Sequence, residues 1–191
     1  MSHTSPYARK VRVFGLELGL EAQLDEVPVT PTDDPEALVA VNPVSKIPAL
    51  VTDDGINIHD SRVIIAYLAS LVPPTDLYPQ PADPQRWQAM TMAAHCDAIL
   101  DAAVSWRLEQ LRQPGERSIY WQGRWKAQIE RALDALPAYR PYAELLIAVA
   151  LGYLEFRHPT LGWRNNRPAL VELYDRWSKR PSMVATRHPA V

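Results

Sequence analysis

The sequence predicts a small α/β domain followed by an all-helical domain, and three observations support this fold class. Before residue 72, segments whose apolar residues recur with the period of a helix alternate with segments whose apolar residues recur with the period of a strand. The next segment, VPPTDLYPQPADP, contains five prolines in thirteen residues, which is typical of a linker. Beyond it, the apolar pattern is helical throughout. We therefore expect domains at residues 1–72 and 85–191, joined by a proline-rich linker at residues 73–84.

The composition excludes several classes of protein. The 191 residues are 47% hydrophobic, enough for a real core, and the net charge of −2 lacks the excess expected of a protein that binds nucleic acid or anionic membranes. Cys96 is the single cysteine, which excludes an intrachain disulfide or a multi-cysteine zinc site and favours a cytoplasmic location. The start of the chain, MSHTSPYARK, has no apolar signal segment, and the longest apolar run, LLIAVALGYL, is too short to span a membrane. We expect a soluble protein whose partner is a small molecule or another protein.

The first expected element is a helix over residues 6–20, in which apolar residues alternate with charged ones at helical spacing. Ser5 is suited to cap its free amides. Pro6 suits the first helical position, because its missing N–H would have no partner there. Gly19 is the expected end of the helix.

The remainder of the first domain is expected to mix strands and short helices. Residues 22–29 predict a strand, and residues 34–41 predict a helix that stops at Asn42-Pro43. Residues 48–59 predict a β-hairpin, because an Asp-Gly pair between two apolar runs favours a tight turn. Residues 61–71 predict the next helix.

The second domain is expected to be built from helices alone, because its apolar residues keep a helical period between the proline and glycine breaks. Four helices are expected, over residues 84–112, 119–136, 143–156 and 168–178.

The order of these motifs resembles that of the soluble glutathione transferases. TSPYARKVRV is similar to the entrance of their first helix, NPVSKIPAL to their proline loop, and DSRVIIAYL to their γ-glutamyl site. ALGYLEFR and RPALVELYDRWSKRPS resemble the closing helices of bacterial members. The resemblance implies a thioredoxin-like amino-terminal domain and a helical-bundle carboxyl-terminal domain. It further implies a cytoplasmic homodimer that conjugates glutathione, its co-substrate, to a small apolar electrophile in detoxification, without a metal.

The pair Asp60 and Ser61 is the expected γ-glutamyl site. Ser61 opens a helix, whose free amides and positive dipole end attract a carboxylate. By the resemblance, Ser61 binds the γ-glutamyl carboxylate and Asp60 holds the ammonium group of glutathione. The alternative interpretation is that both residues only cap the helix.

The proline loop is expected to bind the middle and the end of the tripeptide. On the resemblance, Pro48 follows a cis peptide bond, and the main chain of Ile47 pairs with the cysteinyl residue like an added strand. Lys46 is placed to meet the glycine carboxylate, and the alternative is a solvated surface lysine.

Ser5 stands where the family places its catalytic hydroxyl, and Thr4 is the reserve candidate. A hydrogen bond from this hydroxyl would favour the thiolate of glutathione, which is the nucleophile. The alternative role of Ser5 is again that of a helix cap. Cys96 lies within a predicted helix and is interpreted as a buried small residue, not as a nucleophile.

The second substrate is expected to lie in an apolar pocket lined by Tyr7, Met90 and Trp106. No motif of the sequence identifies that substrate. The histidines have no spacing that indicates a metal site.

Two departures from the family pattern bear on activity. Family members have an apolar strand ahead of the Ser-Pro helix, whereas only residues 1–4 precede the Ser5-Pro6 pair here. The helix near Ala143 lacks the usual Ser/Thr capping box and follows a shortened junction. A helix entrance without its strand would hold the Ser5 hydroxyl loosely, so we expect a weak enzyme. Two alternatives stay open, namely a non-catalytic binding or scaffold protein of this fold and a glutathione-dependent isomerase or reductase.

Overall fold

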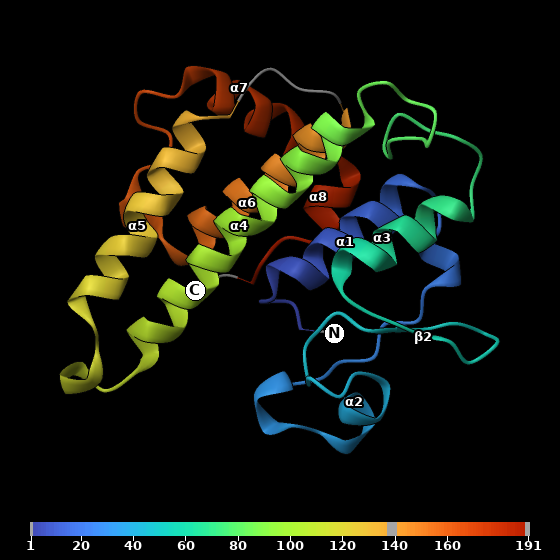
Figure 1. Ribbon diagram of the computed structural model, residues 1–191, viewed down its shortest axis with the longest axis horizontal. Helices are drawn as coiled ribbons and strands as arrows, with labels where there is room; N and C mark the ends of the chain where they lie inside the picture. Colours follow the sequence, from blue (N-terminus) through green and yellow to red (C-terminus); the bar gives the residue numbers. More distant parts are fainter. Residues whose placement is uncertain (1, 137–140, 190–191) are drawn as a thin grey trace. The chain divides into compact units, whose positions relative to one another are not determined.

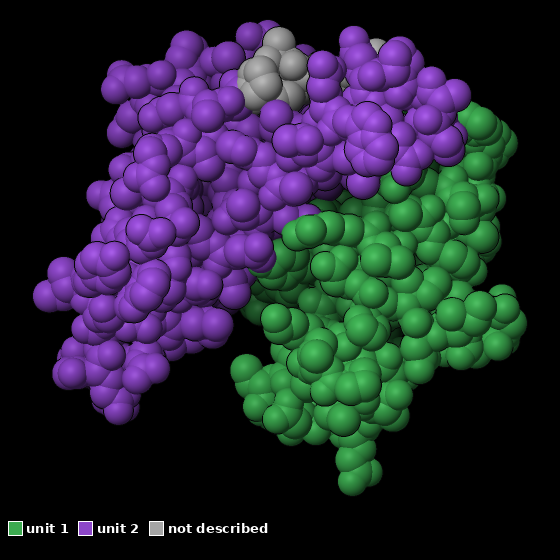
Figure 2. All heavy atoms as spheres, in the orientation of Figure 1, with its two compact units in different colours: residues 1–78, 181–190 green, residues 79–180, 191 purple. Residues whose placement is uncertain are grey.

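The structure is a computed structural model that describes residues 2–136 and 141–189 (Figure 1). It divides into two compact units, which Figure 2 shows in different colours. Unit 1 comprises Met1–Tyr78 with Pro181–Ala190, and unit 2 comprises Pro79–Arg180 with Val191. None of the helices in the described residues has the length and apolar character needed to cross a membrane.

Unit 1 is built around two helices that pack against each other, α1 (Pro6–Glu17) and α3 (Ser61–Ser70). The cap and the proline at the start of α1 are those that the sequence predicts. Phe14 of α1 and Ile64 of α3 are almost fully buried, so apolar burial holds this pair together. The other regular elements of the unit are α2 (Glu36–Val41), β1 (Leu50–Val51), β2 (Asn57–Ile58) and α8 (Pro181–Ala185).

The predicted hairpin is confirmed. Strands β1 and β2 pair in antiparallel fashion, with Leu50 opposite Ile58 and Val51 opposite Asn57. Gly55 in the turn has a φ of 83°, a backbone conformation that residues with a side chain rarely adopt. The glycine of the Asp-Gly pair is therefore required by the turn geometry.

The predicted strand at residues 22–29 is wrong. Residues Glu21–Gln23 form a 3₁₀ turn, and Leu24 is extended but belongs to no strand. Among the described residues the sheet contains only β1 and β2. An extended backbone becomes a strand only when a neighbouring strand pairs regularly with its N–H and C=O groups, and no residue from 22 to 29 is part of such a ladder in the described chain.

Unit 2 confirms the four predicted helices to within two residues at each end. They are α4 (Arg86–Leu111), α5 (Ile119–Asp134), α6 (Pro141–Arg157) and α7 (Pro168–Trp177). Helix α4 packs against α5 and α6, and α6 packs against α7. Residues 145–151 of α6 are buried without interruption, which makes this helix the centre of the unit. The junction at residues 137–140, which the sequence predicts to be shortened, lies outside the described residues.

Helix α8 was not predicted from the sequence, which placed residues 181–191 with the helical domain. In the structure α8 belongs to unit 1 and packs against α1. Periodicity predicts that a segment is helical but does not predict which unit covers its apolar side.

Candidate functional site

The amino-terminal end of α1 carries the first candidate group. The Ser5 hydroxyl accepts a hydrogen bond from the Ala8 N–H at 3.2 Å, and the Ser5 C=O accepts one from the Arg9 N–H at 3.0 Å. Ser5 is half-buried, whereas Thr4 is exposed with its hydroxyl 3.0 Å from that of Ser2. Ser5 therefore lies at the positive end of the helix dipole, as a helix cap does.

The amino-terminal end of α3 carries the second group. Asp60 is the N-cap residue, and its carboxylate accepts a hydrogen bond from the Arg62 N–H at 2.9 Å. Ser61, the first helical residue, is 3% exposed, and within the described chain its hydroxyl has no hydrogen-bond partner. A buried hydroxyl beside free helix amides is suited to bind an anion.

The loop before β1 carries the third group. The Ile47–Pro48 peptide bond is cis, as the resemblance implied. Buried Asn42 donates from its Nδ2 to the Lys46 C=O at 2.7 Å, which fixes the loop from one side. In the part of the chain that the structure describes, the N–H and C=O of Ile47 have no hydrogen-bond partner, and the exposed Lys46 ammonium forms no ion pair. This backbone is free to pair with an extended peptide.

The hairpin register brings the second and third groups together. Leu50 lies opposite Ile58, so the same register continued by two residues places Pro48 across from Asp60. The chain then enters α3 at Ser61, directly beside this point.

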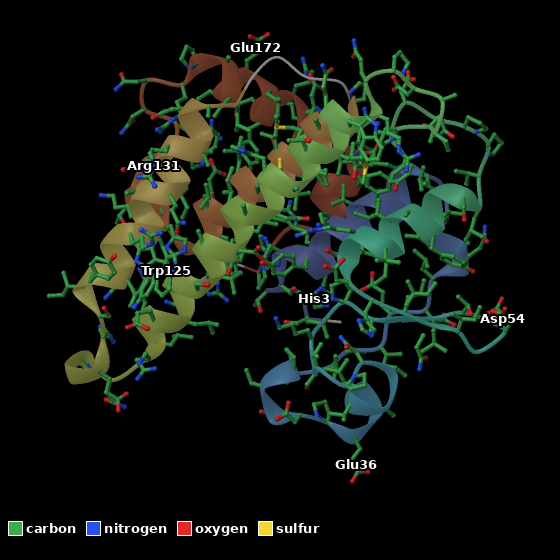
Figure 3. The ribbon with its side chains drawn as sticks, viewed as in Figure 1. His3, Glu36, Asp54, Trp125, Arg131 and Glu172 are labelled. Carbon is green, nitrogen blue, oxygen red and sulfur yellow. The ribbon has the colours of Figure 1, made fainter. Side chains whose placement is uncertain are left out.

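The packing of α1 on α3 brings the first group to the same end of unit 1. The two helices run in the same direction in Figure 1, so their amino-terminal ends lie together. Figure 3 labels His3 ahead of α1 at this end and Asp54 at the far turn of the hairpin. The structure therefore gathers Ser5, Ile47, Pro48, Asp60 and Ser61 at one end of the unit.

The residues expected to line the second-substrate pocket come from both units. Met90 and Trp106 lie on the continuous helix α4, sixteen residues apart, which corresponds to about 24 Å along its axis. The Trp106 ring stacks on His158 with 4.2 Å between ring centroids, and Tyr7 lies on α1 in the other unit. The expected pocket therefore stays a prediction.

His158 is a buried residue of unit 2 that no motif of the sequence indicates. Its Nε2 lies 2.8 Å from the Ala103 C=O, and because a carbonyl only accepts, Nε2 carries the hydrogen. Burial lowers the pKa of His158 below its ordinary value of 6.5; the bond to Ala103 opposes this shift, and the nearby Arg107 and Arg157 add to it. The neutral ring is thus the form that stabilises unit 2.

We expect the free energy of unfolding to fall as the pH drops below about 6.5, because the unfolded chain then binds a proton that folded His158 does not. This stabilisation is complete above the unfolded pKa and is lost as the pH falls through the lower folded pKa. A His158→Gln variant keeps a donor for Ala103 but cannot titrate. Urea unfolding of both proteins at about pH 7.5 and about pH 5.5 checks the prediction. An equal pH dependence in the two proteins would contradict it.

Among the described residues, no three or more His, Cys, Asp or Glu side chains are grouped as metal ligands. Cys96 is buried in α4.

Known proteins resemble this chain over its whole length. The family described as "Glutathione S-transferase, N-terminal domain" matches residues 4–71. The uncharacterized GST-like protein YibF of Escherichia coli K12 is 32% identical over an alignment that covers 98% of this chain and 96% of the relative. The chain belongs to the glutathione S-transferase family.

Solved structures of bacterial family members agree with this assignment. A glutathione transferase family member from Pseudomonas fluorescens Pf-5, with bound glutathione, is 39% identical, with a TM-score of 0.91 over 100% of this chain and 98% of that chain. A second structure, described with the same source and bound to S-(propanoic acid)-glutathione, is 38% identical, with a TM-score of 0.85 and the same coverage. The glutathione S-transferase from Methylobacillus flagellatus KT, with glutathione bound, is 32% identical, with a TM-score of 0.89 over 99% of this chain and 98% of that chain. The predicted fold class, a thioredoxin-like region followed by an all-helical domain, is confirmed.

Proposed function

We propose that this protein binds glutathione, ionises its thiol and conjugates glutathione through its sulfur to a small apolar electrophile. The observation that carries the proposal is the gathering of two helix amino-terminal ends and an unpaired loop backbone at one end of unit 1. Glutathione is an extended tripeptide with two carboxylates, one ammonium group and a thiol, so its site needs complementary groups for each.

The groups at this end match those needs one by one. The amides at the start of α3 and the Ser61 hydroxyl bind the γ-glutamyl carboxylate, and Asp60 accepts from the ammonium group. The Ile47 main chain pairs with the cysteinyl residue, and the exposed Lys46 ammonium meets the glycine carboxylate. Glutathione or a glutathione conjugate is bound in the three similar structures, which supports this assignment.

Ser5 is proposed to activate the thiol. A hydroxyl can donate one hydrogen bond while it accepts another, so Ser5 can cap Ala8 and still donate to the sulfur. The two interpretations of Ser5 are therefore compatible. A hydrogen bond to a charged acceptor contributes about 1.5–3 kcal/mol and the helix dipole about 0.3–1, which together lower the thiol pKa by about one to three units. The thiol releases its proton to solvent water, the resulting thiolate forms the carbon–sulfur bond, and the electrophile loses its leaving group or takes up a proton from water.

Retention on immobilised glutathione, followed by an assay with a generic aromatic electrophile, tests the proposal. Retention with turnover supports a transferase. Retention without turnover supports the second candidate, a glutathione-binding or scaffold protein, which the short sheet of only two strands in the described residues favours. Turnover with a different second substrate identifies a glutathione-dependent isomerase or reductase, which would use the same site. No retention and no turnover would reject the transferase and the isomerase or reductase, and would leave a scaffold protein of this fold.

We further propose that the protein acts in the cytoplasm as a homodimer, as the family resemblance implies. Light scattering at micromolar concentration is expected to show a species with twice the 21.5 kDa mass of the chain. A single species of 21.5 kDa would contradict the dimer.

A further inference from the structure

The carboxyl-terminal segment of unit 1, residues 181–189, contacts α1 and the residues just before it. Near the end of α1, the Ser182 hydroxyl donates a hydrogen bond to the Glu17 carboxylate. In the segment itself, the Thr186 hydroxyl donates to the Ser182 C=O at 2.7 Å. Thr186 is 1% exposed and Met183 1%, so this segment is part of the core of unit 1 and not a loose tail.

His188 contacts the chain just before the α1 entrance. Its Nδ1 lies 3.0 Å from the His3 C=O, and because a carbonyl only accepts, Nδ1–H is the donor. His3 precedes Ser5 by two residues, and the Ser5 N–H donates to the Ser2 C=O at 3.2 Å. His188 therefore fixes the short stretch that leads into the Ser5 cap.

Arg9 contacts the same segment one turn after Ser5. Its guanidinium is buried and donates to the Met183 C=O at 3.3 Å and to the Thr186 hydroxyl at 3.5 Å. The Arg9 N–H in turn donates to the Ser5 C=O at 3.0 Å. Hydrogen bonds from a charged donor are stronger than those between two neutral groups, so the Arg9 guanidinium holds the first turn of α1 against the segment.

From these contacts we infer that residues 181–189 position Ser5. His188 holds the backbone before Ser5 and Arg9 holds the backbone after it, so the segment fixes the entrance of α1 on both sides of Ser5. His188 is a positioning residue, because it acts on the reaction through Ser5. The catalytic consequence rests on the proposed function of Ser5.

The positioning contact is tested first without glutathione. In His188→Ala, amide hydrogen exchange at Ala8, whose N–H donates to the Ser5 hydroxyl, is expected to accelerate about tenfold, because a less fixed entrance opens more often. His188→Asn keeps a donor near the position of Nδ1 and is expected to restore slow exchange. His188→Gln has a similar size but places its donor near the position of Nε2, so it is expected to behave like the alanine variant.

The matched control is His95→Ala in unit 2. His95 Nε2 lies 2.9 Å from the Ala132 C=O, so this variant loses the same kind of hydrogen bond away from α1. It is expected to leave exchange at Ala8 unchanged. Unchanged exchange in both His188→Ala and His188→Gln would overturn the positioning contact, whatever the protein does with glutathione.

The second arm follows the thiol of bound glutathione by its ultraviolet thiolate absorbance against pH. His188→Ala is expected to raise the thiol pKa by about half a unit to one unit and to lower turnover about tenfold, with affinity within about twofold, because a displaced hydroxyl weakens one transition-state contact. His188→Asn should recover both quantities. An unchanged thiol pKa in His188→Ala would show a purely structural role and overturn the inference. A wild-type chain that fails to lower the thiol pKa would instead reject the proposed function.

Discussion

Ser5→Ala is expected to lower turnover by about ten- to a thousandfold and to change glutathione affinity by no more than a few-fold. The hydroxyl is the proposed donor to the thiolate, whereas the groups proposed to bind the two carboxylates and the ammonium lie at α3 and in the Lys46–Pro48 loop. Loss of the donor removes stabilisation of the charged thiol and leaves the peptide contacts in place. The variant should therefore lose turnover while it keeps most of its affinity for glutathione.

Ser5→Ala also removes a helix cap, which costs about 0.5–2 kcal/mol of stability. Ser118→Ala is the matched control, because the Ser118 hydroxyl accepts from the Trp121 N–H at 3.2 Å, as Ser5 accepts from Ala8. The two variants should lose similar stability in urea unfolding, and only Ser5→Ala should lose turnover and raise the pKa of the bound thiol. Equal turnover in the two variants would remove Ser5 from the mechanism and leave Thr4 as the candidate.

The parts of the fold that the sequence predicts are those encoded locally. Ser5-Pro6 determines the start of α1 through its own amides, and Asp54-Gly55 determines the hairpin turn through the backbone freedom of glycine. The helices of unit 2 follow from periods repeated over several turns. The positions around Pro48 and Asp60 were predicted from motif order, and the hairpin register is the physical reason that they meet.

The parts that the sequence does not predict depend on distant segments. Residues 22–29 have strand periodicity, but in the described chain they are not part of a ladder, and regular pairing with a distant segment is what makes an extended backbone a strand. His188 and Arg9 give no local signal of their contacts, because each meets residues more than 170 positions away along the chain. Met90 and Trp106 are grouped by residue type alone, and their positions sixteen residues apart on α4 give no local signal of a shared pocket.

The double variant Asp60→Asn, Ser61→Ala is expected to weaken glutathione binding about 100-fold. Each residue offers one hydrogen bond to a charged group, worth about 1.5–3 kcal/mol, and the exposure of Asp60 reduces its share. Asparagine remains a good N-cap, so α3 keeps its start and the loss reports on the ligand contacts. Isothermal calorimetry of the double variant and of each single variant measures the effect.

Raising the salt concentration distinguishes the contribution of Asp60 to glutathione affinity from that of Ser61. The exposed Asp60 should lose its contribution as the ionic strength rises, because the Debye length falls to about 3 Å at 1 M salt, so Asp60→Asn should approach wild-type affinity there. Ser61 is buried, so the effect of Ser61→Ala should persist. Asp53→Asn, in the hairpin turn, removes an exposed charge of the same unit away from the α3 entrance and should leave affinity unchanged at both salt concentrations. Wild-type affinity in the double variant at low salt would show that Asp60 and Ser61 only cap α3 and that glutathione, if bound, is held elsewhere.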